Sequence, residues 1–183
     1  MPTVARSSLA ATLESIWLDT YYGDVAVMVL ADSLGSPARK VFEEYAGEGW
    51  SYDEYDRLGC FGHPVSNAAL DSLQRIGNRW VARMDDDDCY LIGAIPTMLE
   101  HLEPVPVIYR ARWGPGHPAA GVELPHMHEV RYGNIATPMV VAPVCNARYG
   151  MRMEGDFDYA EALVAELGEP IWRDELICLV RPE

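Results

Sequence analysis

The run Val25–Leu30 constrains the fold more than any other stretch of the sequence. It is apolar throughout and rich in valine, and it is followed by Ala31, Asp32 and Ser33. Strands that are buried on both faces of a parallel sheet have this continuous pattern, whereas half-exposed strands alternate apolar and polar residues. The chain must therefore supply helices that cover both faces of a sheet.

Amphipathic helices are predicted on either side of this run. Apolar residues recur at helical spacing from Leu9, after Pro37, from Val65 and from Ile92. Serines precede the first two of these segments as N-caps, and Gly77 ends the third. Residues 46–64 show no clear period and are predicted to be a surface connection.

Two more strands complete the first part of the chain, at residues 79–84 and 105–112. The order α-β-α-α-β-α-β predicts an α/β fold with a mixed, mainly parallel sheet flanked by helices. Residues 113–124 are rich in proline and glycine and predict a loop. A strand at 139–144, a helix at 159–167 and a strand at 171–180 follow, and no boundary divides residues 1–183 into two domains.

The charge balance excludes several classes of function. The chain has 14 Lys and Arg against 28 Asp and Glu, a net charge of −14, so binding to a nucleic-acid backbone is not expected. The longest apolar run, Val25–Ala31, is far shorter than the roughly 20 residues of a membrane-spanning helix. The four cysteines are widely separated and form no C-x-x-C pair, which favours a reducing compartment, and we expect a cytoplasmic protein.

Four consecutive aspartates, Asp85–Asp88, directly follow the second predicted strand. Open α/β sheets bind ligands at the carboxyl ends of their strands, and carboxylates placed there suit Mg²⁺ or Mn²⁺. A solvated acidic turn is the alternative. An EF-hand is excluded because Tyr90 and Pro96 stand where its loop needs glycine and glutamate.

A second acidic group, Glu154–Asp158, lies where a loop is predicted to enter a helix. Carboxylates at such a junction are ordinary helix caps, and they can also serve as a general base. His126 and His128 form an H-x-H pair that is interpreted as structural or surface-exposed.

Five segments in this order resemble the inverting nucleotide-sugar glycosyltransferases of family 2, which have the GT-A fold. They are Pro2–Leu9 (PT-x-x-R-x-x-L), Val29–Ser33 (the V-x-D-D-G-S strand end), the helix Asn67–Gly77, Trp80–Asp88 (the strand ending in D-x-D-D) and Glu154–Tyr159 (g-E-D-w-D). The resemblance covers most of the chain. It implies a metal-dependent transfer of a sugar from a nucleoside-diphosphate sugar, UDP- or GDP-linked, to an acceptor hydroxyl with inversion.

The resemblance also implies a role for particular residues. Thr3, Arg6 and Asp32 would line the nucleotide pocket, and Asp85 or Asp86 would hold the ribose. Asp87, with Asp85, would bind Mn²⁺ or Mg²⁺, and Asp156 would be the catalytic base. Residues 1–112 would then form the nucleotide-binding half, and residues 113–183 the acceptor and catalytic half.

The chain departs from the family pattern at three places. Ala31 replaces the first aspartate of one motif, Gly155 replaces a glutamate of another, and Met1 stands where the first strand would end. These departures leave open a catalytically degenerate module that binds a nucleotide or sugar. A sugar nucleotidyltransferase is a further alternative, although its phosphate loop rich in glycine and lysine is not found near the N-terminus.

Overall fold

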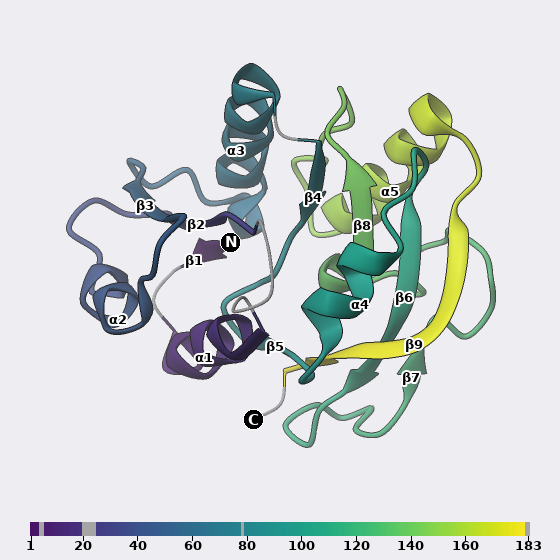
Figure 1. Cartoon of the computed structure of the whole chain (residues 1–183), viewed down its shortest axis with the longest axis horizontal. Coiled ribbons are helices and arrows are strands. Elements are labelled where there is room, and N and C mark those ends of the chain that lie inside the picture. Colours follow the sequence, from purple (N-terminus) through teal and green to yellow (C-terminus); the bar gives the residue numbers. More distant parts are fainter. Residues whose placement is uncertain (4–5, 20–24, 78, 182–183) are drawn as a thin grey trace.

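The computed structural model describes residues 1–3, 6–19, 25–77 and 79–181. Two β-sheets lie side by side, as Figure 1 shows, with β1–β3 in one and the later strands in the other. The first sheet holds β1 (Pro2–Thr3), β2 (Val27–Ala31) and β3 (Trp50–Glu54). The second holds β4 (Trp80–Ala82), β5 (Asp88–Tyr90), β6 (Val107–Trp113), β7 (Glu123–Leu124), β8 (Val140–Pro143) and β9 (Ile171–Val180).

The first sheet is parallel and has β2 at its centre. Val29, Leu30 and Ala31 are almost completely buried, which confirms the strand expected from the apolar run. β3 falls within residues 46–64, which were predicted to be only a surface connection, so that prediction was wrong for Trp50–Glu54. Its sequence WSYDE alternates half-buried and exposed residues at the edge of the sheet, and pairing with β2 rather than its own composition makes it a strand.

The second sheet has the order β4-β8-β6-β9-β5, with β7 paired to β6. β6 and β9 are parallel, whereas the pairs β4–β8, β6–β8, β6–β7 and β5–β9 are antiparallel. The expected mixed α/β architecture is confirmed, but parallel strands predominate in the first sheet alone. The difference arises because β7, β8 and β9 are joined by loops and by one helix, so the chain after β6 does not continue the β-α-β repeat.

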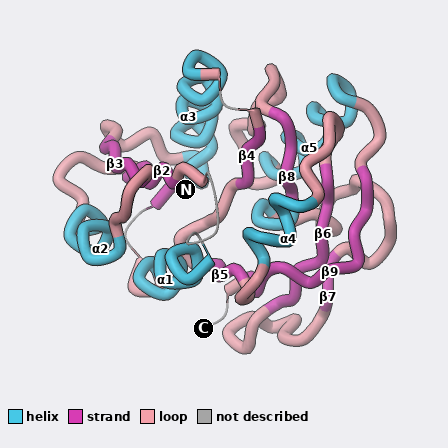
Figure 2. The backbone as a smooth tube through the Cα atoms, in the orientation of Figure 1, coloured by secondary structure: helices cyan, strands magenta, loops and turns pink. Residues whose placement is uncertain are grey.

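The helices are α1 (Leu9–Asp19), α2 (Ala38–Tyr45), α3 (His63–Ile76), α4 (Ala94–Glu100) and α5 (Gly155–Leu167). In Figures 1 and 2, α4 crosses in front of β6 and β8, while α5 lies behind them. All five were predicted in sequence, although α5 begins four residues earlier than expected. Asp156 is therefore inside the first turn of a helix rather than in the loop before it.

Helix α1 ties the two sheets together. The Asp19 carboxylate accepts hydrogen bonds from the backbone N–H groups of Gly93 (2.9 Å) and Ile95 (3.0 Å), at the start of α4. The Ser15 hydroxyl oxygen accepts one from Tyr90 N–H at 3.1 Å, in β5. The short strand β5 is thus fixed from the side of the first sheet as well as by its partner β9. In the described part of the chain, no helix is long and apolar enough to span a membrane.

Candidate functional site

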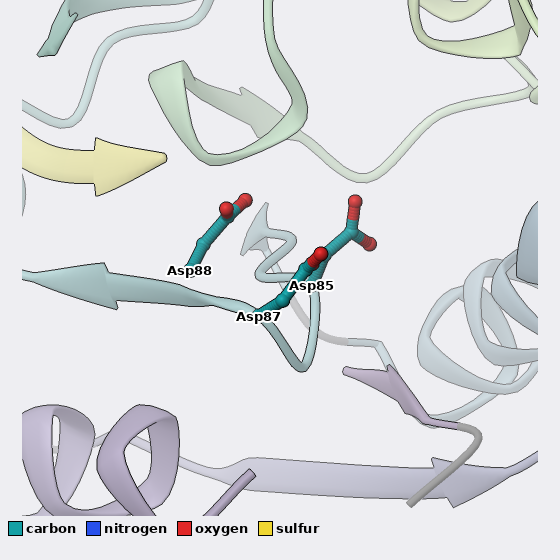
Figure 3. A group of neighbouring side chains, drawn as sticks. All are labelled: Asp85, Asp87 and Asp88. Atoms are coloured by element: carbon teal, nitrogen blue, oxygen red, sulfur yellow. The ribbon is translucent and has the colours of Figure 1, made fainter. Parts of the chain in front are cut away.

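The tetra-aspartate segment forms a tight turn between β4 and β5. Asp88 N–H donates to the carbonyl of Asp85 at 3.3 Å, and Asp88 opens β5, where it lies opposite Val180 of β9. Figure 3 shows Asp85, Asp87 and Asp88 on one side of this turn, beside the end of β9. The strand-then-carboxylate order read from the sequence therefore places these groups at a strand end.

Asp85, Asp87 and Asp88 each offer an oxygen, and these oxygens lie within 4.8 Å of one another. Three carboxylate oxygens at this separation fit a hard divalent cation such as Mg²⁺ or Mn²⁺. Asp85 and Asp87 were predicted from the sequence to bind the metal, and the structure adds Asp88 to the carboxylates that could do so. Asp88 is the fourth aspartate of the run. The direction of its side chain is set by the pairing of β5 with β9, which the sequence does not reveal.

Asp86 faces the opposite way, toward the start of the chain. Its Oδ2 accepts a hydrogen bond from the Thr3 hydroxyl at 2.7 Å, and its Oδ1 lies 2.9 Å from Nη1 of Arg6. The same Arg6 nitrogen is 2.6 Å from Asp87 Oδ1. The structure thus brings Thr3, Arg6 and Asp86 together, and Val4 and Ala5 of the same motif lie outside the described residues.

Asp32 lies beside Thr3 at the end of β2, because its backbone N–H donates to the Thr3 carbonyl at 2.9 Å. Both of its carboxylate oxygens accept backbone hydrogen bonds, from Leu58 N–H at 2.7 Å and Gly59 N–H at 2.9 Å. The four residues expected to bind the nucleotide, apart from Asp85, therefore form one neighbourhood. Within it, Asp32 anchors the loop that leads into α3.

Arg83 joins the two acidic segments and was not singled out in the sequence. Its Nη2 lies 2.8 Å from Asp85 Oδ1, and its Nη1 lies 3.2 Å from Asp156 Oδ1. The guanidinium is buried and stacks on the ring of Tyr149, with Cζ 4.5 Å from the ring centroid. An arginine inside the otherwise apolar segment WVARM was the available signal, since such a charge requires a buried partner.

The electrostatics of the carboxylates differ with their partners. Burial pushes the pKa of Asp156 upward, but the interaction with His63 and the charge of Arg83 outweigh it, so the pKa lies below its usual value. Burial raises the pKa of Asp85, and the Arg83 charge opposes that rise. Burial, followed by the charge of Asp85, raises the pKa of Asp88 to about 8. At neutral pH the site therefore contains an ionised Asp156 and an Asp88 that tends to hold its proton.

A cavity of about 270 Å³ opens onto these groups. Its lining combines the acidic side chains of both segments with apolar and aromatic ones: Asp85, Asp87, Asp88, Asp156, Trp113, Tyr132, Met153 and Phe157. Arg181 also lines it, 3.6 Å from Asp87 Oδ2 through its Nε. A space lined by both carboxylates and aromatic rings suits a polar ligand with exposed C–H faces, such as a sugar.

The H-x-H pair belongs elsewhere. His126 and His128 line a different cavity with Arg110 and Asp174, and His128 stacks on Trp172 with ring centroids 5.3 Å apart. Neither histidine is among the described groups that could hold a metal ion. Both histidines are exposed, which agrees with the interpretation of this pair as structural or surface-exposed.

No protein-family model matches the chain, and no curated protein matches its sequence. Solved structures do match its fold. A crystal structure of S. aureus TarS has a TM-score of 0.72 at 11% identity, covering 98% of this chain and 35% of that one. The mannosyltransferase PcManGT from Pyrobaculum calidifontis, in complex with GDP-Man and Mn²⁺, has a TM-score of 0.62 at 15% identity, covering 98% and 55%.

A second TarS structure, of residues 1–349, gives a TM-score of 0.71 at 13% identity over 98% of this chain and 58% of that one. These likenesses show that the chain has the GT-A-like fold of glycosyltransferases. The chain spans about a third to three-fifths of the length of these structures.

Proposed function

We propose that the protein is a metal-dependent glycosyltransferase that moves a sugar from a nucleoside-diphosphate sugar to an acceptor hydroxyl with inversion at the anomeric carbon. The observation that supports it most directly is that Asp156 faces the same cavity as Asp85, Asp87 and Asp88. A single ligand in this cavity could therefore contact both the proposed base, Asp156, and the carboxylate cluster. The GT-A-like fold is consistent with this chemistry and does not by itself establish it.

Asp85, Asp87 and Asp88 would hold the Mg²⁺ or Mn²⁺. The chemistry that such a cation supplies when bound is positive charge, which offsets that of a diphosphate in a protein of net charge −14. Arg6 and Arg181 lie against Asp87, at 2.6 and 3.6 Å from its carboxylate oxygens. They would contribute further positive charge toward the departing nucleoside diphosphate.

Asp156 would act as the general base. Its lowered pKa keeps it ionised, so that it can accept the proton of the acceptor hydroxyl. The acceptor oxygen then forms a bond to the anomeric carbon while the bond to the diphosphate oxygen breaks on the opposite side. Because one displacement occurs without a covalent intermediate on the enzyme, the configuration inverts.

Thr3, Arg6, Asp32 and Asp86 would form the pocket for the nucleoside, next to the carboxylate turn. We infer a UDP- or GDP-sugar as donor, and PcManGT, which binds GDP-Man and Mn²⁺ in its structure, provides a precedent in the same fold. Residues 113–183 contribute Trp113, Tyr132 and Phe157 to the cavity and would receive the acceptor. The competing proposal is a binding module that has lost catalysis, which Ala31 and Gly155 favour.

The experiment is a thermal-shift titration with UDP, GDP, CDP and TDP, each with Mn²⁺ and with EDTA. A ligand that binds only the folded protein raises its melting temperature by mass action. We expect one nucleoside diphosphate to raise Tm strongly and to need Mn²⁺ for the effect. If a well-folded sample shows no shift with any of the four, the nucleotide-sugar assignment is wrong.

A further inference from the structure

His63 lies against the proposed base and has no part in the mechanism so far. It is the first residue of α3, its side chain is 3% exposed, and its Nε2 lies 3.7 Å from Asp156 Oδ1. Its ring stacks on Tyr149, with centroids 5.6 Å apart and an interplanar angle of 17°. The position of the ring is therefore fixed by packing as well as by its polar contact.

Gly155 makes room for this ring. A Cβ at position 155 would lie less than 3.0 Å from the Cε1 and Nδ1 atoms of His63 and from the Gly150 carbonyl oxygen. Gly155 is not among the glycines with a positive φ, so the requirement comes from space rather than from backbone conformation. A larger residue here would push His63 away from Asp156, and the departure from the family's glutamate is linked to His63.

The loop before His63 has an unusual backbone conformation that sets the position of this residue. Residues 59–62 all have positive φ, including Cys60 at 49° and Phe61 at 58°, where residues other than glycine are strained. The Asp32 carboxylate holds the start of this run through the N–H groups of Leu58 and Gly59. Backbone strain of this kind persists where the surrounding structure fixes it, and it gathers at functional sites.

We propose that His63 is a positioning residue for Asp156 and that Gly155 is small in order to admit it. This inference rests on the proposed function, in which Asp156 takes the acceptor proton. Arg83 Nη1 and His63 Nε2 both approach Oδ1 of Asp156, at 3.2 and 3.7 Å. Two contacts on one oxygen restrain the carboxylate and would leave Oδ2 to take the proton of the acceptor hydroxyl.

The kinetic test compares two substitutions of His63. The assay measures release of nucleoside diphosphate from UDP-glucose, UDP-GlcNAc and GDP-mannose with Mn²⁺, and uses the donor that the wild-type protein turns over fastest. His63→Phe keeps the stacked ring but lacks the N–H, and we expect kcat to fall roughly ten- to hundredfold while KM for the donor changes little. His63→Gln carries a side-chain N–H and should recover part of that loss.

His101→Gln is the matched control, because His101 lies at the end of α4 and bonds the Thr97 carbonyl. It should keep wild-type kcat. The inference is overturned if His63→Phe retains wild-type kcat, or if His63→Gln is no better than His63→Phe in a sample that melts at the same temperature.

A second measurement needs no substrate and separates this inference from the proposed function. Gly155→Ala should lower Tm, and it should lower Tm less in the His63→Ala background, because the ring that it would displace is gone. His63→Phe should likewise cost less stability in the Asp156→Asn background. Additive effects in both cycles would show that His63 does not contact these residues, whether or not any donor is turned over.

Gly47→Ala serves as the glycine control in the thermal measurements. The nearest atoms to a Cβ at that position are 3.8 and 3.9 Å away, both in Trp50. The substitution should change Tm little and by the same amount with and without His63. If the wild-type protein hydrolyses none of the donors, the proposed function fails. The two double-mutant cycles still test whether His63 contacts Gly155 and Asp156.

Discussion

Arg83 and Asp156 form an ion pair between segments that are 73 residues apart in the chain. The Arg83 side chain is only 7% exposed, while the Asp156 side chain is 31% exposed and lines the cavity. The same guanidinium also holds Asp85 at 2.8 Å. One buried cation therefore sets the distance between the proposed base and the proposed metal ligands.

Arg83→Met should be strongly destabilising. It removes the cation and leaves two carboxylates, 30% and 31% exposed, without their partner. Because both are partly exposed, the loss of unfolding free energy should be at most about 3 kcal/mol, the low end of the range for buried pairs. Urea unfolding followed by circular dichroism measures this. Arg152→Met is the control, since Arg152 pairs with Asp158 on the surface and such pairs contribute at most about 1 kcal/mol. Equal losses in the two variants would contradict a special role for Arg83.

Asp156→Asn should abolish turnover while nucleotide binding persists. Asparagine is nearly the same size but cannot accept the proton, and general-base catalysis typically contributes about 10²- to 10⁴-fold. The measurement is nucleoside-diphosphate release from the preferred donor, together with the Mn²⁺-dependent thermal shift. Asp158→Asn, two residues further along α5, should keep its kcat. Undiminished turnover in Asp156→Asn would show that another group is the base, and a protein without any turnover would favour the binding module.

Asp87→Asn should weaken Mn²⁺ binding about tenfold or more, because one of three oxygen ligands loses its charge. Isothermal titration of the nucleotide-free protein with Mn²⁺ measures the affinity. The exposed Asp53 of β3 gives a matched control, since Asp53→Asn changes the net charge equally at another place. A loss of affinity of the same size in both variants would mean that overall charge, and not this cluster, attracts the cation.

Asp88 should make the metal-free protein less stable as the pH rises. Its pKa is about 8 in the folded protein and about 3.9 when unfolded, so between these values the folded state binds more protons. The unfolding free energy therefore falls from pH 5 to pH 8, and Asp88→Asn should show a flatter dependence. Thermal unfolding in EDTA across this range tests the difference. Parallel curves for the two proteins would show that Asp88 is ionised in the folded state at neutral pH.

The sequence predicted elements with strong internal patterns. The run Val25–Leu30 overlaps β2 (Val27–Ala31), and Leu9–Trp17 lies within α1 (Leu9–Asp19), because the apolar pattern of each marks the residues that become buried. β3 was not predicted, because WSYDE becomes a strand only through its pairing with β2. The antiparallel pairing in the second sheet was not predicted for the same reason, since the relative direction of two strands depends on how distant segments of the chain pair.

The residues of the candidate site also differ in how far the local sequence predicts them. Asp85, Asp87 and Asp156 were identified from acidic runs at element ends, and the structure places all three on one cavity. Arg83 and His63 contact partners that are far away in sequence. The segment WVARM indicates that Arg83 needs a buried partner without identifying it, and no local pattern marks His63. Asp32 was expected to line the nucleotide pocket, and the hydrogen bonds that it accepts from Leu58 and Gly59 show that it supports the loop before α3.

The pairing of β5 with β9 determines when the carboxylate turn can form during synthesis. Asp88 lies opposite Val180, and Cys89 lies opposite Leu179, so β5 gains the sheet partner that the described residues show only after β9 has left the ribosome. A nascent chain that ends before Ile171 contains all four aspartates but cannot yet hold them in place. Premature termination in this region would therefore yield a protein with an intact acidic motif and no assembled site.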